Sequence, residues 1–318
     1  MRPDVKPRGY GEREALLQLG QALEQLGYSF TTVTPLTHQR VNARPGNELA
    51  EHLRDVFGWS RPFKDGVLDD SMLRFLEHAN SLLTQGDTWH SAVRWSTLHG
   101  RLFVHSRFPT QEQDAVFFGP DSYRFIQALL AHLHDEPREH LRIADIGCGA
   151  GVGAIVAALE RPHSEVWALD INPKALLYTE VNAELAGAAN VRTLHSDVLK
   201  QVDGEFDLII ANPPYMADAE QRAYRDGGGE HGAGLSIAIV EAALARLSPG
   251  GSLLLYTGVA MFDGTDPFFT AVSDRLRAAG CEWQYWEMDS DVFGEELLEP
   301  AYQQAERIAA VVLRVTRH

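Results

Sequence analysis

The pattern of hydrophobic and polar positions differs between the N-terminal and the C-terminal part of the chain. Residues 93–108 alternate with period two, and His99-Gly100 marks the turn of a hairpin. We therefore expect a small N-terminal helical module over residues 1–90, with a role in substrate recognition, and a bridging β-hairpin over residues 91–114. Apolar residues recur at helical spacing three times before the hairpin, over residues 12–26, 48–57 and 71–83.

Beyond residue 115, strand and helix patterns alternate to the end of the chain. Apolar strand segments such as LRIADI, EVWALDI and FDLIIA are followed by glycine or proline turns and then by stretches with helical period. This order predicts an α/β fold with a Rossmann-like, doubly wound, mostly parallel sheet that ends in an antiparallel pair of strands. We expect residues 115–318 to form this domain.

The charge is distributed unevenly along the chain. Its formal net charge is −16, yet residues 1–110 carry 13 Lys and Arg against 12 Asp and Glu, so the excess of acid lies in residues 111–318. An acidic domain repels a nucleic-acid backbone unless a local basic surface offsets the repulsion. The charge therefore disfavours a nucleic-acid substrate without excluding it.

Composition also restricts the compartment and the metal chemistry. The chain has no run of about 18 apolar residues, and its first residues, MRPDVKPRGYGERE, lack the apolar stretch of a secretory signal. We expect a cytoplasmic protein with no membrane partner. Cys148 and Cys281 are too few and too far apart for a disulfide framework or a zinc site, so we predict no metal.

A glycine-rich turn, Asp145-Ile-Gly147-Cys-Gly149-Ala-Gly151, lies between a predicted strand and a predicted helix. Glycines let the backbone turn tightly and approach a ligand, and the helix amino terminus faces the same crevice. A bound nucleotide or nucleoside is implied. Asp170, at the end of the next strand, can accept both hydroxyl hydrogens of a ribose.

The third strand ends at Ser196-Asp197-Val198. Asp197 is placed to accept the amino group of adenine, and Val198 offers a backbone N–H and an apolar contact. A simple turn aspartate is the alternative interpretation of Asp197.

The segment Asn212-Pro213-Pro214-Tyr215 follows the apolar strand FDLIIA. The prolines restrict the backbone, so the Asn212 side chain and the Pro213 carbonyl are expected to present two acceptors to one NH₂ group. Such hydrogen bonds favour the pyramidal nitrogen, whose lone pair can attack, and Tyr215 can stack on a planar group. We therefore predict Asn212, Pro213 and Tyr215 as the catalytic residues.

Together, DIGCGAG, Asp170 and NPPY resemble the class I amino-methyltransferases, most closely the glutamine N5 methyltransferases that modify peptide-chain release factors. The resemblance covers about residues 115–318 and implies a seven-stranded sheet, S-adenosyl-L-methionine as cofactor and a protein glutamine as acceptor. It also implies that FFGPDS, residues 117–122, covers the cofactor. The candidate cofactor-binding residues are Phe118, Asp145, Gly147, Gly149, Gly151, Asp170, Ile171, Asp197, Val198 and Asn212.

Two alternatives stay open for the function. Methyltransferases that act on exocyclic amines of adenine or guanine in ribosomal RNA or DNA share the NPPY-type loop, so RNA or DNA is the second candidate substrate. The third hypothesis is a non-catalytic protein that binds the cofactor, although cofactor binding alone would not require the NPPY segment. The segment 224–232, YRDGGGEHG, departs from the family pattern, and we expect it to form a mobile loop on the acceptor side.

Overall fold

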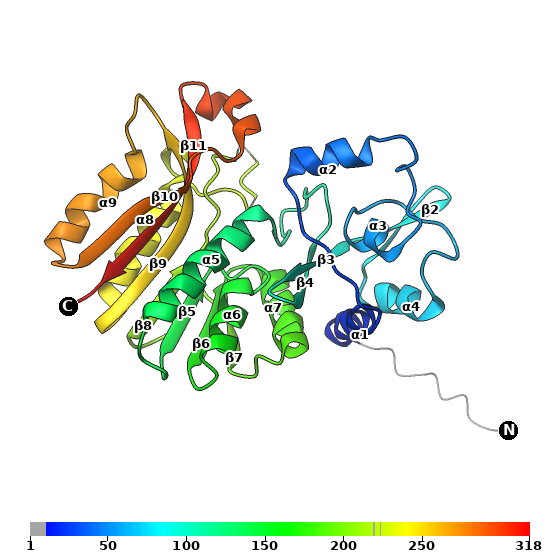
Figure 1. The fold of residues 1–318 in the computed structure, drawn as a ribbon, viewed down its shortest axis with the longest axis horizontal. Coiled ribbons are helices and arrows are strands. Elements are labelled where there is room, and N and C mark those ends of the chain that lie inside the picture. The colour runs from blue at the N-terminus through cyan, green and yellow to red at the C-terminus, as the bar shows by residue number, and fades with distance from the viewer. Residues whose placement is uncertain (1–10, 219, 223) are drawn as a thin grey trace. The chain divides into compact units, whose positions relative to one another are not determined.

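The structure is a computed structural model that describes residues 11–218, 220–222 and 224–318. Over these residues the chain divides into two compact units. Figure 1 colours the chain from blue at the N-terminus to red at the C-terminus. Unit 1 contains the residues up to 110 together with 184–186, and unit 2 contains residues 111–183 and 187–318. The acidic excess of the sequence therefore falls almost wholly on unit 2.

Unit 1 combines short helices with two antiparallel hairpins, and its core contains the fully buried side chains of Leu16, Phe57, Trp95 and Phe103. The N-terminal ends of two helices are capped by side chains, since Thr34 accepts the N–H of Thr37 and Asp69 that of Met72. Its elements are α1 (Glu12–Gln25), α2 (Pro35–Asn42), α3 (Leu53–Phe57), α4 (Asp70–His78), β1 (Leu82–Gln85), β2 (Thr88–Ser91), β3 (Val93–Leu98) and β4 (Arg101–Ser106).

Two predicted helices of unit 1 are shorter than their hydrophobic pattern. The stretch 71–83 leaves the helix after His78, because Asn80 adopts a left-handed conformation (φ 50°) and the Ser81 N–H turns back to the Leu76 carbonyl. The stretch 48–57 is helical only over α3, which begins where the Asp55 carboxylate accepts the N–H of His52. The hydrophobic pattern identified the buried positions but not the local contacts at which these helices begin or end.

The predicted hairpin is present as β3 and β4, with His99 and Gly100 at its turn. It belongs to unit 1 instead of forming a separate linker, because its side chains complete that unit's core. Trp95 and Phe103 are fully buried, and the Thr97 N–H donates to the Phe30 carbonyl. The boundary between the units therefore falls at residue 110.

Unit 2 has the predicted Rossmann-like α/β fold. Its seven strands lie in the order β10-β11-β9-β8-β5-β6-β7, parallel from β9 to β7, while β11 pairs antiparallel with both β9 and β10. Its main elements are α5 (Pro120–Asp135), β5 (Arg142–Ile146), α6 (Val152–Glu160), β6 (Glu165–Asp170), α7 (Pro173–Ala186), β7 (Val191–His195), β8 (Phe206–Ala211), α8 (Gly234–Arg246), β9 (Leu247–Met261), α9 (Pro267–Ala278), β10 (Glu282–Asp289) and β11 (Arg307–Thr316), with short 3₁₀ turns at Glu230–Gly232, Gly294–Leu298 and Pro300–Tyr302.

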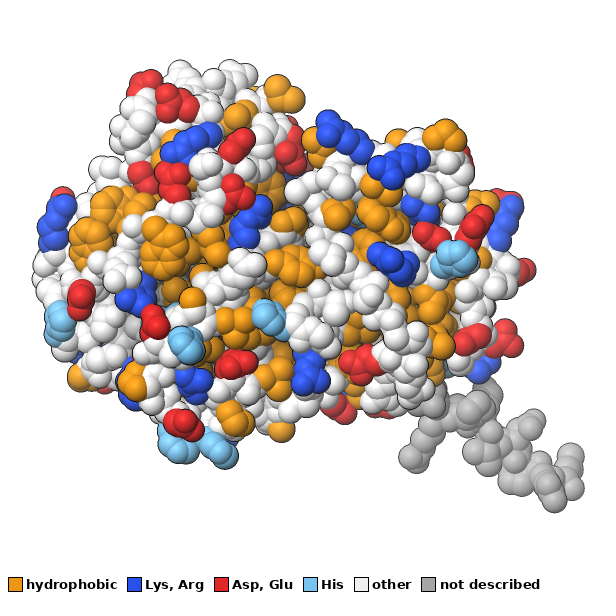
Figure 2. Space-filling view, in the orientation of Figure 1, with side chains coloured by type: hydrophobic (Ala, Val, Ile, Leu, Met, Phe, Trp, Pro, Cys, Tyr) orange, Lys and Arg blue, Asp and Glu red, His pale blue; other side chains and the backbone are white. Residues whose placement is uncertain are grey.

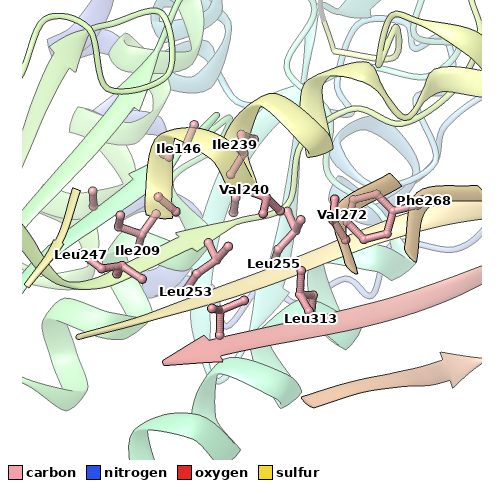
Figure 3. Packing of buried hydrophobic residues seen from close by; sticks show 14 of the residues in the cluster. Ile146, Ile209, Ile239, Val240, Leu247, Leu253, Leu255, Phe268, Val272 and Leu313 are labelled. Carbon is pink, nitrogen blue, oxygen red and sulfur yellow. The ribbon is translucent and has the colours of Figure 1, made fainter. Parts of the chain in front are cut away.

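The two faces of the sheet are both apolar because helices cover each of them. Leu253 and Leu255 of β9 pack with α8 and α9, as Figure 3 shows. The alternate residues Ser252 and Tyr256 face α5, where Ser252 hydrogen-bonds to His132 at 2.9 Å. This period-two division between two buried faces explains the continuous apolar strands of the sequence.

The strand order reverses between β5 and β8, which are neighbours in the sheet although they are far apart in the sequence. From β5 the chain moves outward through β6 to β7, and then returns to β8 on the other side of β5. At such a reversal the connecting loops diverge and leave a crevice at the carboxyl ends of the strands. A functional site is expected there.

Candidate functional site

A cavity of about 210 Å³ lies at the carboxyl ends of β5 to β8. The strand ends supply Asp145, Asp170, Ser196 and Asn212 to its wall, and the remainder comes from the turns after these strands, from the segment 115–125 and from the segments that follow β8. Parallel strands end at one edge of the sheet, which is why these four strand-end residues, up to 67 positions apart, meet in one cavity. Of the predicted site residues, all except Phe118 and Gly151 line it.

The glycine turn after β5 adopts the conformation its composition predicts. Gly147 and Gly149 have φ of 69° and 55°, in the left-handed region that side chains rarely occupy. A β-carbon added to Gly147 would meet no atom within 4 Å, so the turn borders open space. Gly151 (φ 78°) acts differently, because its β-carbon would lie 2.7 Å from the side chain of Thr179 on α7. Its contribution is close packing at the start of α6.

Asp145 and Asp170 lie at the ends of neighbouring strands; Asp145 is buried and Asp170 is half-buried. Asp145 accepts the N–H of Ala154 at 2.8 Å, and burial raises its pKa to about 7, with a further contribution from Asp170. The Asp170 carboxylate accepts the N–H of Gly149 at 2.9 Å and that of Asn172 at 2.8 Å; burial raises its pKa although these bonds act in the opposite direction. Each carboxylate oxygen can accept more than one hydrogen bond, so Asp170 keeps acceptor capacity toward the cavity.

Next to Asp170 the cavity wall is apolar. Ile171 is 53% exposed and lines the cavity. Val198 lines it too, with φ of 54°, a conformation that is strained for a β-branched residue. Asp197 is exposed and forms an ion pair with Lys200. This part of the cavity wall is therefore apolar at Ile171 and Val198 and acidic at Asp170 and Asp197.

The prediction for Phe118 is wrong by one residue. Phe118 is 3% exposed, contacts the Tyr123 ring edge-on at 5.6 Å and does not line the cavity. Phe117 lines it instead, and its ring is parallel to that of Tyr224 at 6.5 Å. The segment before α5 is extended, so adjacent side chains point in opposite directions, and the sequence did not indicate which of the two points inward.

Asn212 lies directly after β8 and lines the cavity together with Pro213, Pro214 and Tyr215. Neither the Asn212 side chain nor the Pro213 carbonyl is hydrogen-bonded to another of the residues that the structure describes. Within the described ranges, internal turn contacts therefore do not occupy these acceptors. They are available to a ligand in the same cavity as the glycine turn.

The Tyr215 hydroxyl donates to the Asp121 carboxylate at 2.5 Å, and its ring is 7% exposed. The ring still lines the cavity, but it is fixed from behind. No sequence motif indicates Asp121 as a partner of Tyr215. The same is true of Phe293, whose ring packs against the Tyr215 ring at a centroid distance of 6.1 Å from a loop that carries no recognisable motif.

The glycine-rich segment 224–232 packs against the NPPY segment and Met216. The Met216 N–H donates to the Arg225 carbonyl, and the Gly227 N–H donates to the Met216 carbonyl. A β-carbon on Gly227 would lie 1.9 Å from the Gly232 carbonyl oxygen, and one on Gly232 would lie 2.2 Å from that of Tyr215. Close backbone approach thus accounts for these glycines.

The described ranges contain neither a group of metal ligands nor a membrane-spanning helix. Among those residues, no group of three or more His, Cys, Asp or Glu side chains is arranged to hold a metal ion. Across the same part of the chain, no helix has the length and apolar character needed to span a membrane.

By sequence, part of the chain is similar to methyltransferases. Residues 125–261 match the family model described as methyltransferase small domain. The chain is 36% identical over 151 residues to a release factor glutamine methyltransferase of Salmonella typhimurium, covering 44% of this chain and 53% of the relative. It is 32% identical over 199 residues to the enzyme of that name from Moorella thermoacetica, covering 58% and 66%.

The chain spans about half the length of the first curated relatives it matches. Among solved structures, the complex of aTrm5 and tRNALeu aligns with a TM-score of 0.52 and 13% identity, covering 100% of this chain and 82% of that chain. At this identity the alignment supports the fold alone.

Proposed function

Residues 125–261 form an S-adenosylmethionine-dependent methyltransferase domain that resembles the release factor glutamine methyltransferases, and from this premise we propose that the chain methylates the side-chain amide nitrogen of a protein glutamine. The observation that carries the proposal is the availability of the Asn212 side chain and the Pro213 carbonyl, both in the cavity that contains the glycine turn.

The residues of the cavity fit the cofactor. Asp170 would hold the ribose hydroxyls, Ile171 and Val198 would contact the adenine plane, and Asp197 would accept its amino group. Gly147 and Gly149 leave room for the methionine part. We call the wall formed by residues 145–149, 170–172 and 196–198 the cofactor side, and the wall formed by residues 212–216, 224–225 and 293 the acceptor side. When bound, S-adenosylmethionine supplies an activated methyl group.

The chain's own residues then act on the acceptor. An amide nitrogen is a poor nucleophile because its lone pair is delocalised into the carbonyl group. Asn212 and the Pro213 carbonyl each accept one N–H of the amide and favour the pyramidal nitrogen, while the Tyr215 ring orients its plane. A strong base is unnecessary, since the nitrogen becomes acidic as it gains the methyl group and its proton can leave through these acceptors or water.

Transfer from labelled S-adenosylmethionine tests the proposal. The purified chain is incubated separately with a bacterial peptide-chain release factor, with ribosomal RNA and with DNA. We expect protease-sensitive label in the release factor and a mass increase of one methyl group on a glutamine-containing peptide. Label that nuclease removes would support an exocyclic-amine substrate instead. Binding of S-adenosylhomocysteine without transfer to any acceptor would favour the non-catalytic alternative.

Unit 1 is included in the proposal as the part that recognises the protein substrate. On the face drawn in Figure 2, Lys and Arg side chains lie among hydrophobic ones over α2 and α3. Leu36 and Arg40 are exposed and four positions apart on α2, and Arg44 and Leu49 are exposed just beyond it. Changing Arg40→Glu together with Arg44→Glu should raise the KM for the release factor and leave kcat unchanged; an unchanged KM would remove this assignment.

A further inference from the structure

The buried carboxylate of Asp121, beside the Tyr215 ring, connects three parts of unit 2 directly and a fourth through Arg124. Asp121 is the second residue of α5 and is 2% exposed. Its Oδ2 accepts the Tyr215 hydroxyl at 2.5 Å, and its Oδ1 accepts the hydroxyl of Tyr256, on β9, at 2.7 Å. Arg124 lies 3.3 Å from the same Oδ1 and also pairs with Asp289 of β10 at 2.8 Å.

The arrangement fixes the Tyr215 ring on several sides. Its hydroxyl is held by Asp121, and the Phe293 ring packs against it at 6.1 Å with an interplanar angle of 67°. A β-carbon on Gly258 would lie 2.2 Å from Tyr215 Cε2, so the glycine on β9 leaves space for the ring. The ring therefore has little freedom to rotate or tilt.

The electrostatics of the cluster favour hydroxyl groups that donate. Burial and the neighbouring Asp121 charge raise the pKa of Tyr215 far above its ordinary value, so its hydroxyl keeps its proton. Burial raises the pKa of Asp121, while the two tyrosine hydroxyls and Arg124 act in the opposite direction. The position of Asp121 in the first turn of α5 also favours a negative charge there.

We propose that Asp121 is a positioning residue, which acts on methyl transfer through Tyr215 by fixing the ring that orients the acceptor amide. This inference rests on the proposed function and adds a residue to it. Fixing the ring before the substrate binds avoids the entropy cost of ordering it in the complex. A rigid ring also holds the acceptor nitrogen in the attacking geometry, where small displacements have large effects on rate.

Three variants separate positioning from folding. In Asp121→Asn, the hydrogen bonds from Arg124 and Tyr256 should keep the amide oxygen at the Oδ1 position. The NH₂ group then faces Tyr215 and cannot accept a hydrogen bond from its hydroxyl, so only the contact with Tyr215 is lost. Tyr215→Phe removes the same contact from the other partner. Tyr285→Phe is the matched control, since its hydroxyl donates to Asp266 at the N-terminus of α9, outside the cavity.

We expect kcat for the release factor to fall about tenfold in Asp121→Asn and in Tyr215→Phe, as for loss of one charge-assisted hydrogen bond. The double variant should fall no further than the more affected single variant, because both changes remove one interaction. The S-adenosylhomocysteine dissociation constant should stay within about twofold of wild type, as expected for a contact on the other wall of the cavity. Tyr285→Phe should keep wild-type kcat.

A second readout does not depend on activity. The hydroxyl proton of Tyr215, identified by NMR through its loss in Tyr215→Phe, should exchange with solvent slowly in the wild-type protein and at least about tenfold faster in Asp121→Asn. Unchanged exchange, a wild-type kcat in Asp121→Asn, or an equal loss in Tyr285→Phe would overturn the inference. If the wild-type chain transfers no methyl group, the proposed function fails, and the exchange rates still decide whether Asp121 fixes the ring.

Discussion

The cofactor side and the acceptor side of the cavity are built differently. The cofactor side consists of short motifs at the ends of three strands, and its key carboxylate, Asp170, already accepts two backbone N–H groups. The acceptor side combines residues from three separate segments, and its key amide, Asn212, has no hydrogen bond to the described residues. Every motif of the cofactor side directly follows a strand of the sheet, whereas on the acceptor side only residues 212–216 do so, and Tyr224, Arg225 and Phe293 lie in longer connecting segments.

The largest expected effect is on the acceptor side. Asn212→Ala removes one of two acceptors of the amide hydrogens and should lower kcat by about a hundredfold to a thousandfold, as for loss of a preorganised polar group. Binding of S-adenosylhomocysteine, measured by calorimetry, should persist. Asn212→Asp retains an oxygen acceptor and should lose less. Full activity in Asn212→Ala would refute the mechanism.

The second prediction concerns stability on the cofactor side. Because the pKa of Asp145 is raised to about 7 in the folded protein, the folded state binds more protons than the unfolded state above the ordinary pKa of 3.8. The free energy of unfolding should therefore fall as the pH rises from about 4 to about 7, by up to about 4 kcal/mol from this group.

Asp145→Asn keeps an oxygen for the Ala154 N–H and should flatten that part of the pH profile, measured by urea unfolding. Asp263→Asn is the control, since its side chain is exposed in the same unit. An identical slope in Asp145→Asn and wild type would contradict the assignment.

A smaller effect is expected when the ribose contact is removed. Asp170→Ala should weaken S-adenosylhomocysteine binding by about tenfold to a hundredfold, since a charged acceptor of two hydroxyl groups is lost. Calorimetry measures the change directly. An unchanged affinity would contradict the assignment of Asp170 to ribose binding. Binding of NADH instead of S-adenosylhomocysteine would contradict the assignment of the cofactor.

The smallest effect is expected at Asp197. Its side chain is exposed and paired with Lys200, so Asp197→Ala should weaken S-adenosylhomocysteine binding by only about threefold. Lys200→Ala removes the ion pair but keeps the carboxylate and serves as the matched control. An effect at Asp197 as large as that at Asp170 would show that adenine recognition is polar and not mainly apolar.

The contrast between the two sides also explains what the sequence could predict. That Asp170 and Asn212 line one cavity could be predicted because parallel strands bring their carboxyl ends to one edge, a rule that needs only the order of strands and turns. The orientation of a side chain in an extended segment is not determined by such a rule, so Phe118 was chosen where Phe117 lines the cavity.

Contacts between distant segments were beyond prediction for a related reason. Asp121 and Tyr215 are 94 positions apart, and neither residue type has a unique partner. Phe293 lies in a loop between β10 and β11 whose path depends on the packing of the whole acceptor side. In unit 1, the hydrophobic period identified buried positions in 71–83 but did not reveal the left-handed Asn80 that ends α4.

The glycine-rich segment 224–232, which follows NPPY in the sequence, limits which residues can be changed to alter the acceptor specificity of this chain. Gly227 and Gly232 are in backbone-to-backbone contact with each other and with Tyr215, so a library that randomises them would mostly yield proteins with a displaced Asn212. Variation at Tyr224 and Phe293 alters the cavity lining through side chains and leaves that backbone contact intact. New acceptors should be selected there.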